Sequence, residues 1–501
     1  MNEMVIFLNI NPESLLILGN LLDFLILNSN RIIIHPIRKI TDILKISREY
    51  YIRQKDVRFL LVTKQNKMEI EKNLIKDNLF EIPILHFTKI KTSRFLKIFF
   101  NDFDSNKQNF KNKFLKIYNI DSIDIFTFCI QKPSYFFKKL NINHITIQDF
   151  QKNIWVNSIF IWHLYFSKKL SIQSCSLKIK KISKNMFGFL NKQIKDKDIQ
   201  KCQKFNSLRE LPLYFINHST ILDSFLNTPF MVLIFELWKN EGFMNILQFL
   251  GKINIFPEDF QKSWAMFDQK RKIIILKDYE IEIKKFNPTF GLIYIFKKKL
   301  THLLTKSEIS SLDMVLIIRS IFDRRIEILH YPLNKKKFFS GVNCLFKNKK
   351  LKKYIERGRK IQEFISKVGR IILIKKAFLS RKRYRILYIT GSTLISYRMV
   401  EGLCNFLISA FNKNEMEKKL FLLIIKENIF NTMFISHQDK KMFVIYQKLI
   451  ISNLTKKKIH VLEEEENLLV IKFPKDYEKE LITIFSSLVC IKNTHSLTNI
   501  S

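Results

Sequence analysis

The sequence predicts an α/β fold with a parallel sheet that is interrupted by a long helical insert and followed by a basic C-terminal extension. Short apolar runs alternate with helical patterns over residues 1–103, and residues 104–205 are charged and mainly helical. The alternation resumes over residues 206–255, so one α/β core split by an insert is the simplest account. Residues 256–501 change in character and are predicted to be an α+β extension that can form a separate domain.

The first strands are predicted from two runs rich in apolar and β-branched residues, "RIIIHPI" at 31–37 and "VRFLLVT" at 57–63. Apolar residues near helical spacing predict a helix over 39–55 between them. Two apolar strands joined by such a helix form a parallel pair through a crossover connection. A second helix over 66–79 and a strand in "EIPILHF" follow.

The core is predicted to resume with a strand in "LPLYFI" at 211–216, a short helix over 219–227 and a strand in "PFMVLIFEL" at 229–237. Further on, residues 385–411 have the pattern of a strand, a turn and a helix. These elements indicate a further folded α/β unit within the extension.

The charge indicates a polyanionic partner. There are 86 Lys and Arg residues against 45 Asp and Glu residues, which leaves a formal charge of +41. Nucleic acid is the commonest partner of such a protein, and an anionic membrane surface is the second.

Only three alanines occur, and the abundant Ile, Phe, Lys and Asn have A/T-rich codons, so part of the lysine excess can reflect codon bias. Together with the lack of an N-terminal targeting pattern, this bias predicts an organelle-encoded protein of the mitochondrial matrix. A bacterium or endosymbiont with a reduced genome is the alternative source.

No motif for catalysis, a metal or a cofactor is found in the sequence. The six cysteines have no paired short spacing, and the ten histidines form no known ligand motif. The stretch "ITGSTLIS" at 389–396 lacks the second glycine and the lysine of a phosphate-binding loop. We therefore predict a protein that is not an enzyme, without a metal, a cofactor or a small-molecule substrate.

The strongest binding signal is the segment 335–385, which has nineteen Lys and Arg residues against Glu356 and Glu363. Its basic side chains can neutralise phosphates, and its interleaved aromatics can stack on unpaired bases. The alternative is a solvated basic face inflated by codon bias. The candidate RNA-binding residues of this segment are Lys352, Lys353, Arg357, Arg359, Lys360, Arg381, Lys382, Arg383 and Arg385.

Two blocks of the sequence resemble small-subunit ribosomal protein two, a bacterial-type family. The first comprises "NRIIIHPIRKI", "VRFLLVTKQ" and "TSRF", and the second is "LPLYFINHSTILDSFLNTPFMVLIFE" at 211–236. The positions that fall on the family motif are Asn30, Arg31, Ile34, Lys39, Val62, Thr63 and Lys64.

This resemblance implies a three-layer α/β/α core and a structural role in an organellar, mitochondrial small ribosomal subunit. The partners would be ribosomal RNA and neighbouring ribosomal proteins, with Arg31, Lys39, Lys64 and Arg94 added to the candidate RNA contacts. The extension at 256–501 would have no counterpart in the family. An RNA-processing or intron-encoded protein and a peripheral membrane assembly factor are the alternatives.

A membrane-spanning segment is not expected, because Asp23 and His163 interrupt the longest apolar stretches.

Overall fold

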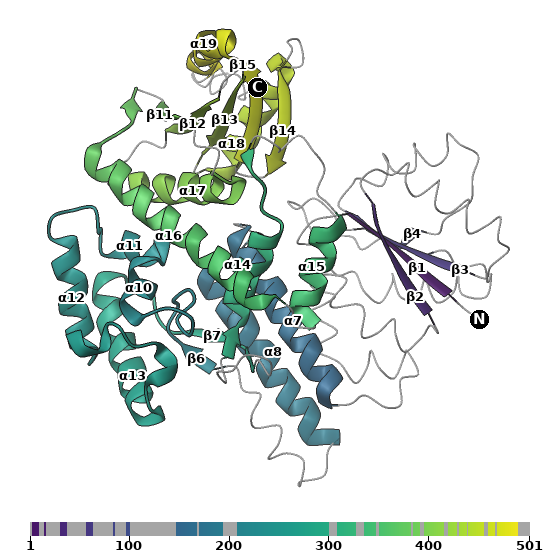
Figure 1. Cartoon of the computed structure of the whole chain (residues 1–501), viewed down its shortest axis with the longest axis vertical. Coiled ribbons are helices and arrows are strands. Elements are labelled where there is room, and N and C mark those ends of the chain that lie inside the picture. The colour runs from purple at the N-terminus through teal and green to yellow at the C-terminus, as the bar shows by residue number, and fades with distance from the viewer. Residues whose placement is uncertain are drawn as a thin grey trace, which may run out of the picture. The chain divides into compact units, whose positions relative to one another are not determined.

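Figure 1 shows the helices and strands of the computed structural model. The residues of the chain fall into two compact units. The first unit comprises residues 1–211, 292–322 and 332–351, and the second comprises 212–291, 323–331 and 352–501. Both units combine helices with strands, so the α/β class is confirmed. The four-part division at residues 103, 205 and 255 stays a prediction. The residues that the structure describes are 3–9, 15–16, 31–37, 57–63, 84–85, 97–100, 147–167, 170–193, 208–299, 308–326, 335–346, 350–381, 384–390, 395–414, 419–427, 430–437, 439–454, 459–465 and 468–488.

A five-stranded sheet lies in the first unit, in the order β2-β1-β3-β5-β4. The strands predicted at 31–37 and 57–63 are confirmed with those bounds, but they do not pair with each other. Strand β1 lies between them, with Val5 opposite Ile33 on one side and Phe59 on the other, and both pairings are parallel. Because β5 runs antiparallel to β3, the sheet is mixed, and the prediction of a wholly parallel sheet is wrong. The bounds are Glu3–Asn9 for β1, Arg31–Ile37 for β2, Val57–Thr63 for β3, Ile84–Leu85 for β4 and Lys97–Phe100 for β5. The helices predicted at 39–55 and 66–79 lie outside the described residues.

Helices and two short strand pairs form the rest of the described part of the first unit. Helices α7 and α14 pack together, and the buried Ser158 hydroxyl of α7 donates a hydrogen bond to the Ser311 hydroxyl of α14 at 2.7 Å. In α8 the Ser176 hydroxyl accepts a hydrogen bond from the backbone N–H of Tyr294 at 2.8 Å, which ties the helix to β7. The bounds are Ile147–Phe166 for α7, Ile172–Gln193 for α8, Ser311–Ile321 for α14, Lys335–Phe346 for α15, Leu208–Glu210 for β6, Ile293–Ile295 for β7, Lys297–Lys299 for β8 and Glu308–Ser310 for β9. Strand β6 pairs with β7, and β8 pairs with β9.

The prediction of strands at 211–216 and 229–237 is wrong. Residues 211–216 form no strand, and the apolar run at 229–237 begins with helix α11 (Pro229–Ile234). Pro229 occupies the first turn of that helix, where its fixed φ favours a helix start and its missing N–H costs nothing. A short apolar run does not distinguish a buried helix from a buried strand, and here the helix is formed.

The second unit contains a helical group before its sheet. The helix predicted at 219–227 is confirmed as α10 (Ile221–Leu226), whose start is capped by the Thr220 hydroxyl accepting from the Asp223 N–H. Helices α12 (Gly242–Lys252) and α13 (Gln269–Phe286) follow α11 and pack on each other.

A six-stranded sheet forms the C-terminal part of the second unit, in the order β10-β11-β12-β13-β15-β14. The predicted strand and helix in 385–411 are confirmed as β11 (Tyr384–Thr390) and α17 (Tyr397–Asn414). Helix α17 connects β11 to the parallel strand β12, and the other pairings in the sheet are antiparallel. The remaining bounds are Leu379–Ser380 for β10, Leu420–Lys426 for β12, Phe430–Ser436 for β13, His460–Glu465 for β14, Leu468–Pro474 for β15, Lys440–Leu454 for α18 and Glu478–Leu488 for α19.

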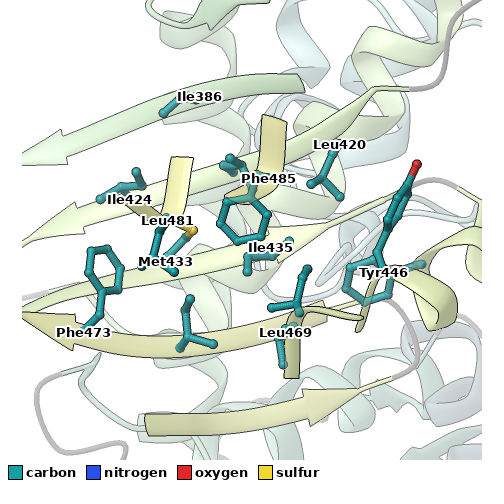
Figure 2. Close-up of a cluster of buried hydrophobic side chains, with 14 residues drawn as sticks. Ile386, Leu420, Ile424, Met433, Ile435, Tyr446, Leu469, Phe473, Leu481 and Phe485 are labelled. Carbon is teal, nitrogen blue, oxygen red and sulfur yellow. The ribbon is translucent and has the colours of Figure 1, made fainter. Parts of the chain in front are cut away.

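Helices cover both faces of this sheet. Side chains of alternate residues in β12, β13 and β15 point to one face, where they pack against α18 and α19 (Figure 2). On the opposite face, Tyr397 of α17 contacts Phe434 of β13, and Phe411 contacts Phe421 of β12. The sequence of β12, "LFLLIIK", is apolar at six successive positions because both faces of this central strand are buried.

Candidate nucleic-acid interface

Helix α16 (Leu351–Lys375) carries the centre of the predicted basic segment, with eight Lys and Arg residues against Glu356 and Glu363. Two glycines fix which face of the helix is buried. A Cβ at Gly358 would stand 2.7 Å from the ring of Phe215, and one at Gly369 would overlap the ring of Phe406. Aromatic rings therefore pack directly on the backbone of one side of α16, and the opposite side is exposed.

The exposed side of α16 alternates in charge. Its exposed residues at spacings of three and four are Lys353, Glu356, Lys360, Glu363 and Lys367. Glu356 forms ion pairs with Arg359 at 3.5 Å and Lys360 at 3.8 Å, as residues three and four apart on a helix do. Much of the positive charge in the middle of the helix is thus balanced within the helix itself.

Arg357 is part of an internal contact. Its guanidinium lies 3.4 Å from the carboxylate of Asp323, a residue that is buried. The same carboxylate accepts hydrogen bonds from the backbone N–H groups of Arg324 at 2.9 Å and Arg398 at 3.0 Å. This interaction holds α16 to the start of α17, since Arg398 lies in the first turn of that helix. Sequence analysis missed Asp323, because two of its partners, Arg357 and Arg398, are 34 and 75 residues away.

Most basic side chains of α16 that have no ion pair lie at the ends of the helix. Among the described residues, seven exposed basic side chains in and beside the helix have no ion pair, and all but Lys367 lie at its ends: Lys350, Lys352, Lys353, Lys367, Lys375, Lys376 and Arg381. Lys352 and Lys353 lie in the first turn, where the helix dipole makes positive charge unfavourable by roughly 0.3–1 kcal/mol each. An anion bound beside these two lysines would remove that penalty.

Arg385 does not belong to this exposed set. It lies on β11 with only 3% of its surface exposed, and its guanidinium stacks over the ring of Phe411 at 4.4 Å. A side chain in this position contacts the core of the second unit rather than a phosphate in solution. The sequence gives the charge of Arg385 but not the direction in which it points.

The other predicted contacts are only partly placed. Arg31 opens β2 of the first unit, and Arg381 follows β10, where its backbone N–H donates to the carbonyl of Tyr384 at 2.9 Å. The residues that lie outside the described part of the chain are Lys39, Lys64, Arg94, Lys382 and Arg383.

Clustered metal ligands are absent from the described residues, and the described thiols are buried. No group of three or more His, Cys, Asp or Glu side chains that could hold a metal ion occurs among them. Burial raises the pKa of the Cys175 thiol to about 12 and that of the Cys344 thiol to about 12, and Cys404 is raised further by burial and the charge of Glu401. These thiols stay protonated at neutral pH and are poor nucleophiles. None of the described helices combines the length and the hydropathy that crossing a bilayer would require.

Comparison with known proteins gives a fold but not a family. No family model matches the chain, and no curated protein matches it. Among solved structures, the crystal structure of CDC45 from Entamoeba histolytica is similar to this chain with a TM-score of 0.65 and 14% sequence identity. The similarity covers 97% of this chain and 94% of that one. At this identity the likeness shows the fold alone.

This likeness overturns the ribosomal interpretation. The protein has the fold of CDC45, a DNA replication factor, and the resemblance to small-subunit ribosomal protein two is wrong. The similarity covers 97% of the chain, so it includes most of residues 256–501. The prediction of ribosomal RNA and ribosomal proteins as partners is therefore also wrong. The comparison supports neither an RNA-processing role nor a membrane assembly role. The two blocks misled because apolar strand–helix–strand units in a sequence rich in Ile, Phe and Lys resemble many families.

Proposed function

We propose that this protein acts in DNA replication as a binding protein with a CDC45-like fold, without catalysing a reaction. The observation that carries the proposal is the extent of the likeness, which covers 97% of this chain and 94% of the CDC45 chain. Because the match extends over nearly the whole of both chains, it does not rest on a single common α/β subdomain. The absence of catalysis stays a prediction.

The charge supports DNA as a direct partner. A formal charge of +41 would repel itself in isolation, and phosphates are its natural counterions. The unpaired basic side chains at the ends of α16 are the described groups best suited to contact them. Lysine binds phosphate as a point charge and reads no base, so the proposed contact is independent of DNA sequence.

Two earlier expectations remain proposals. A three-layer core around the first sheet is one, since helices on both faces of that sheet stay a prediction. The mitochondrial location is the other, and it rests on the codon bias and on the lack of an N-terminal targeting pattern.

Capture of newly replicated DNA tests the proposed function. The protein, tagged in its own cells, should be recovered with DNA labelled by a short pulse of a thymidine analogue and should be lost from that DNA after a chase without the label. A DNA-binding protein of the same compartment that remains on DNA through the chase serves as the control. Recovery in the small ribosomal subunit fraction, with none on pulse-labelled DNA, would contradict the proposal.

A further inference from the structure

Helix α13 (Gln269–Phe286) packs on the second unit through one side. Its start is capped by the Asp268 carboxylate, which accepts a hydrogen bond from the Arg271 N–H at 2.8 Å. Asp278, in the middle of the helix, accepts from the side-chain amide of Asn254 at 2.6 Å. The buried face carries Ile275, Tyr279 and Ile283, which are fully covered.

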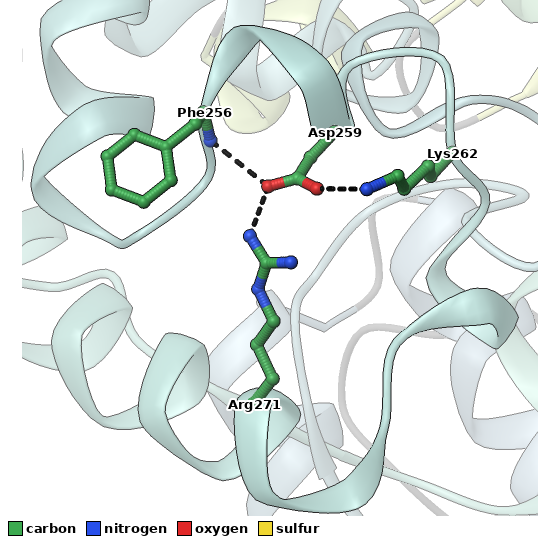
Figure 3. A network of polar contacts seen from close by, with 4 residues as sticks. All are labelled: Phe256, Asp259, Lys262 and Arg271. Carbon is green, nitrogen blue, oxygen red and sulfur yellow. Dashed lines mark hydrogen bonds and ion pairs between the residues drawn. The ribbon is translucent and has the colours of Figure 1, made fainter.

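A charged cluster secures the N-terminal turn of α13 (Figure 3). The buried carboxylate of Asp259 forms an ion pair with Arg271 of the helix and another with Lys262 at 2.8 Å, and it accepts from the backbone N–H of Phe256 at 3.3 Å. Arg271 also lies over the ring of Phe267 at 4.8 Å, and Lys272 lies over the ring of Trp264 at 5.8 Å. Two of the basic residues of the helix are therefore used inside the unit and do not contribute to its free surface.

The opposite side of α13 exposes large apolar residues. Ile273, Ile274 and Ile281 are 58%, 51% and 53% exposed. Lysines are interleaved with them at spacings of three and four, so that both kinds of residue follow one line along the helix. The residues of this exposed stripe are Lys270, Ile273, Ile274, Lys277, Ile281 and Lys284.

The charge of the exposed stripe has a single sign. The three acidic residues of α13 are all half-buried, and each of them has a partner. Asp278 binds Asn254, and Glu282 forms an ion pair with Lys285. The charged groups that a partner would meet on the stripe are thus all lysines. A surface that combines exposed isoleucines with positive charge alone matches a partner that combines apolar side chains with negative charge.

From this pattern we infer that the exposed stripe of α13 binds an amphipathic, acidic segment of another protein, in which apolar and Glu or Asp side chains follow each other at helical spacing. A nucleic acid would use the lysines but leave the isoleucines without an apolar contact. A membrane surface is bound by helices whose basic and apolar residues lie on separate faces, whereas Lys277 lies between Ile274 and Ile281 on one line. A protein segment satisfies both kinds of side chain. The inference is independent of the DNA contact proposed for α16.

The test uses the full-length protein and a synthetic peptide as long as α13, built from Leu and Glu in the alternation that complements the stripe. The controls are a scrambled peptide of the same composition, vesicles of phosphatidylcholine and phosphatidylserine in equal parts, and single-stranded oligothymidine. Two double variants change the stripe, Ile274→Gln with Ile281→Gln and Lys277→Gln with Lys284→Gln. Because all four side chains are exposed, both variants should fold. A third, Lys352→Gln with Lys353→Gln in α16, removes the same number of charges elsewhere.

The patterned peptide should bind more tightly than the scrambled one. Each stripe variant should lower the affinity for the patterned peptide by about tenfold, as loss of central interface contacts does. The α16 variant should leave peptide binding unchanged. Equal binding of the scrambled peptide, equal loss in the α16 variant, or no binding of the patterned peptide would overturn the inference. Binding of vesicles or of oligothymidine that depends on the isoleucines of the stripe would assign the surface to a membrane or to nucleic acid instead and would also overturn it.

Discussion

Helices α13 and α16 of the second unit both carry an excess of basic residues, yet they present it in different ways. In α16, basic and acidic residues alternate along the middle of the exposed side, and Arg357 forms an ion pair with the buried Asp323. Basic side chains without an ion pair remain mainly at the ends of the helix. In α13 two basic residues are bound inside the unit, and the exposed lysines alternate with isoleucines. A count of charges would give both helices the same partner. Their packing gives α16 a surface for phosphates and α13 a surface for an acidic, partly apolar segment.

The largest expected effect concerns the packing that orients α16. Gly369→Val places a branched side chain where the ring of Phe406 lies, and overpacking of this kind should lower the free energy of unfolding of the second unit by about 3 kcal/mol. Gly251→Ala is the control, since a Cβ there meets nothing within 4 Å and alanine should stabilise helix α12 by up to about 1 kcal/mol. Urea denaturation measures both. A Gly369→Val variant as stable as the natural protein would show that α16 is not fixed by this contact.

A smaller effect is expected at the cluster that anchors α13. Burial opposes the charge of Asp259, but the hydrogen bonds from Lys262 and the Phe256 N–H and the charge of Arg271 together hold its pKa below the ordinary value. Asp259→Asn should therefore cost about 2 kcal/mol at neutral pH. Because the pKa is lowered on folding, this contribution is present above the unfolded value near 3.9 and is lost as the pH falls through the folded value.

The measurement is the difference in the free energy of unfolding between the natural protein and Asp259→Asn as a function of pH. Denaturation of the natural protein and Asp259→Asn should differ at pH 7 and converge below about pH 4. Asp268→Asn is a matched control, because asparagine caps a helix about as well as aspartate. A difference that persists unchanged in acid would mean that the Asp259 charge is not what anchors α13.

The smallest expected effect on stability distinguishes a basic residue of α16 that has a buried partner from one that has only an exposed partner. Arg357→Gln removes a charged donor from the buried Asp323 and should cost about 1 kcal/mol, since the two backbone N–H groups still bind the carboxylate. Lys360→Gln breaks only an exposed ion pair at 3.8 Å and should change stability by less than about 0.5 kcal/mol. The two denaturation midpoints give the comparison. If Lys360→Gln proves the more harmful, Arg357 belongs to the free surface.

Local patterns in the sequence predicted elements well where the pattern itself was unambiguous. The strands at 31–37 and 57–63 have the predicted bounds because each is a short apolar, β-branched run with polar residues beside it. The apolar run at 229–237 failed because its length fits either a short helix or a buried strand, and Pro229 favours the helix start. Strand pairing failed for a different reason. The N-terminal run that forms β1 was not interpreted as a strand, and β1 separates the two strands that were expected to pair.

The candidate site was predictable in composition but not in geometry. The sequence shows the basic segment and the spacing of Glu356 with Arg359 and Lys360. It does not show that Arg385 points into the core or that Arg357 meets Asp323, because those contacts join residues far apart in the chain. The stripe of α13 was visible in principle from the helical spacing of lysine and isoleucine in "KIIILKDYEIEIK", but a basic, apolar helix is usually read as core on one side and solvent on the other.

The salt dependence of DNA binding tests most directly the claim that these two helices serve different partners. The affinity of the full-length protein for single-stranded oligothymidine, measured over a series of salt concentrations, gives the number of phosphate contacts from the slope of log affinity against log salt, with about 0.7 per contact. Lys352→Gln with Lys353→Gln should flatten the slope by up to about 1.4, and Lys277→Gln with Lys284→Gln should leave it unchanged. Equal flattening by both variants, or no change in either, would contradict the assignment of phosphate binding to α16 and of protein binding to α13.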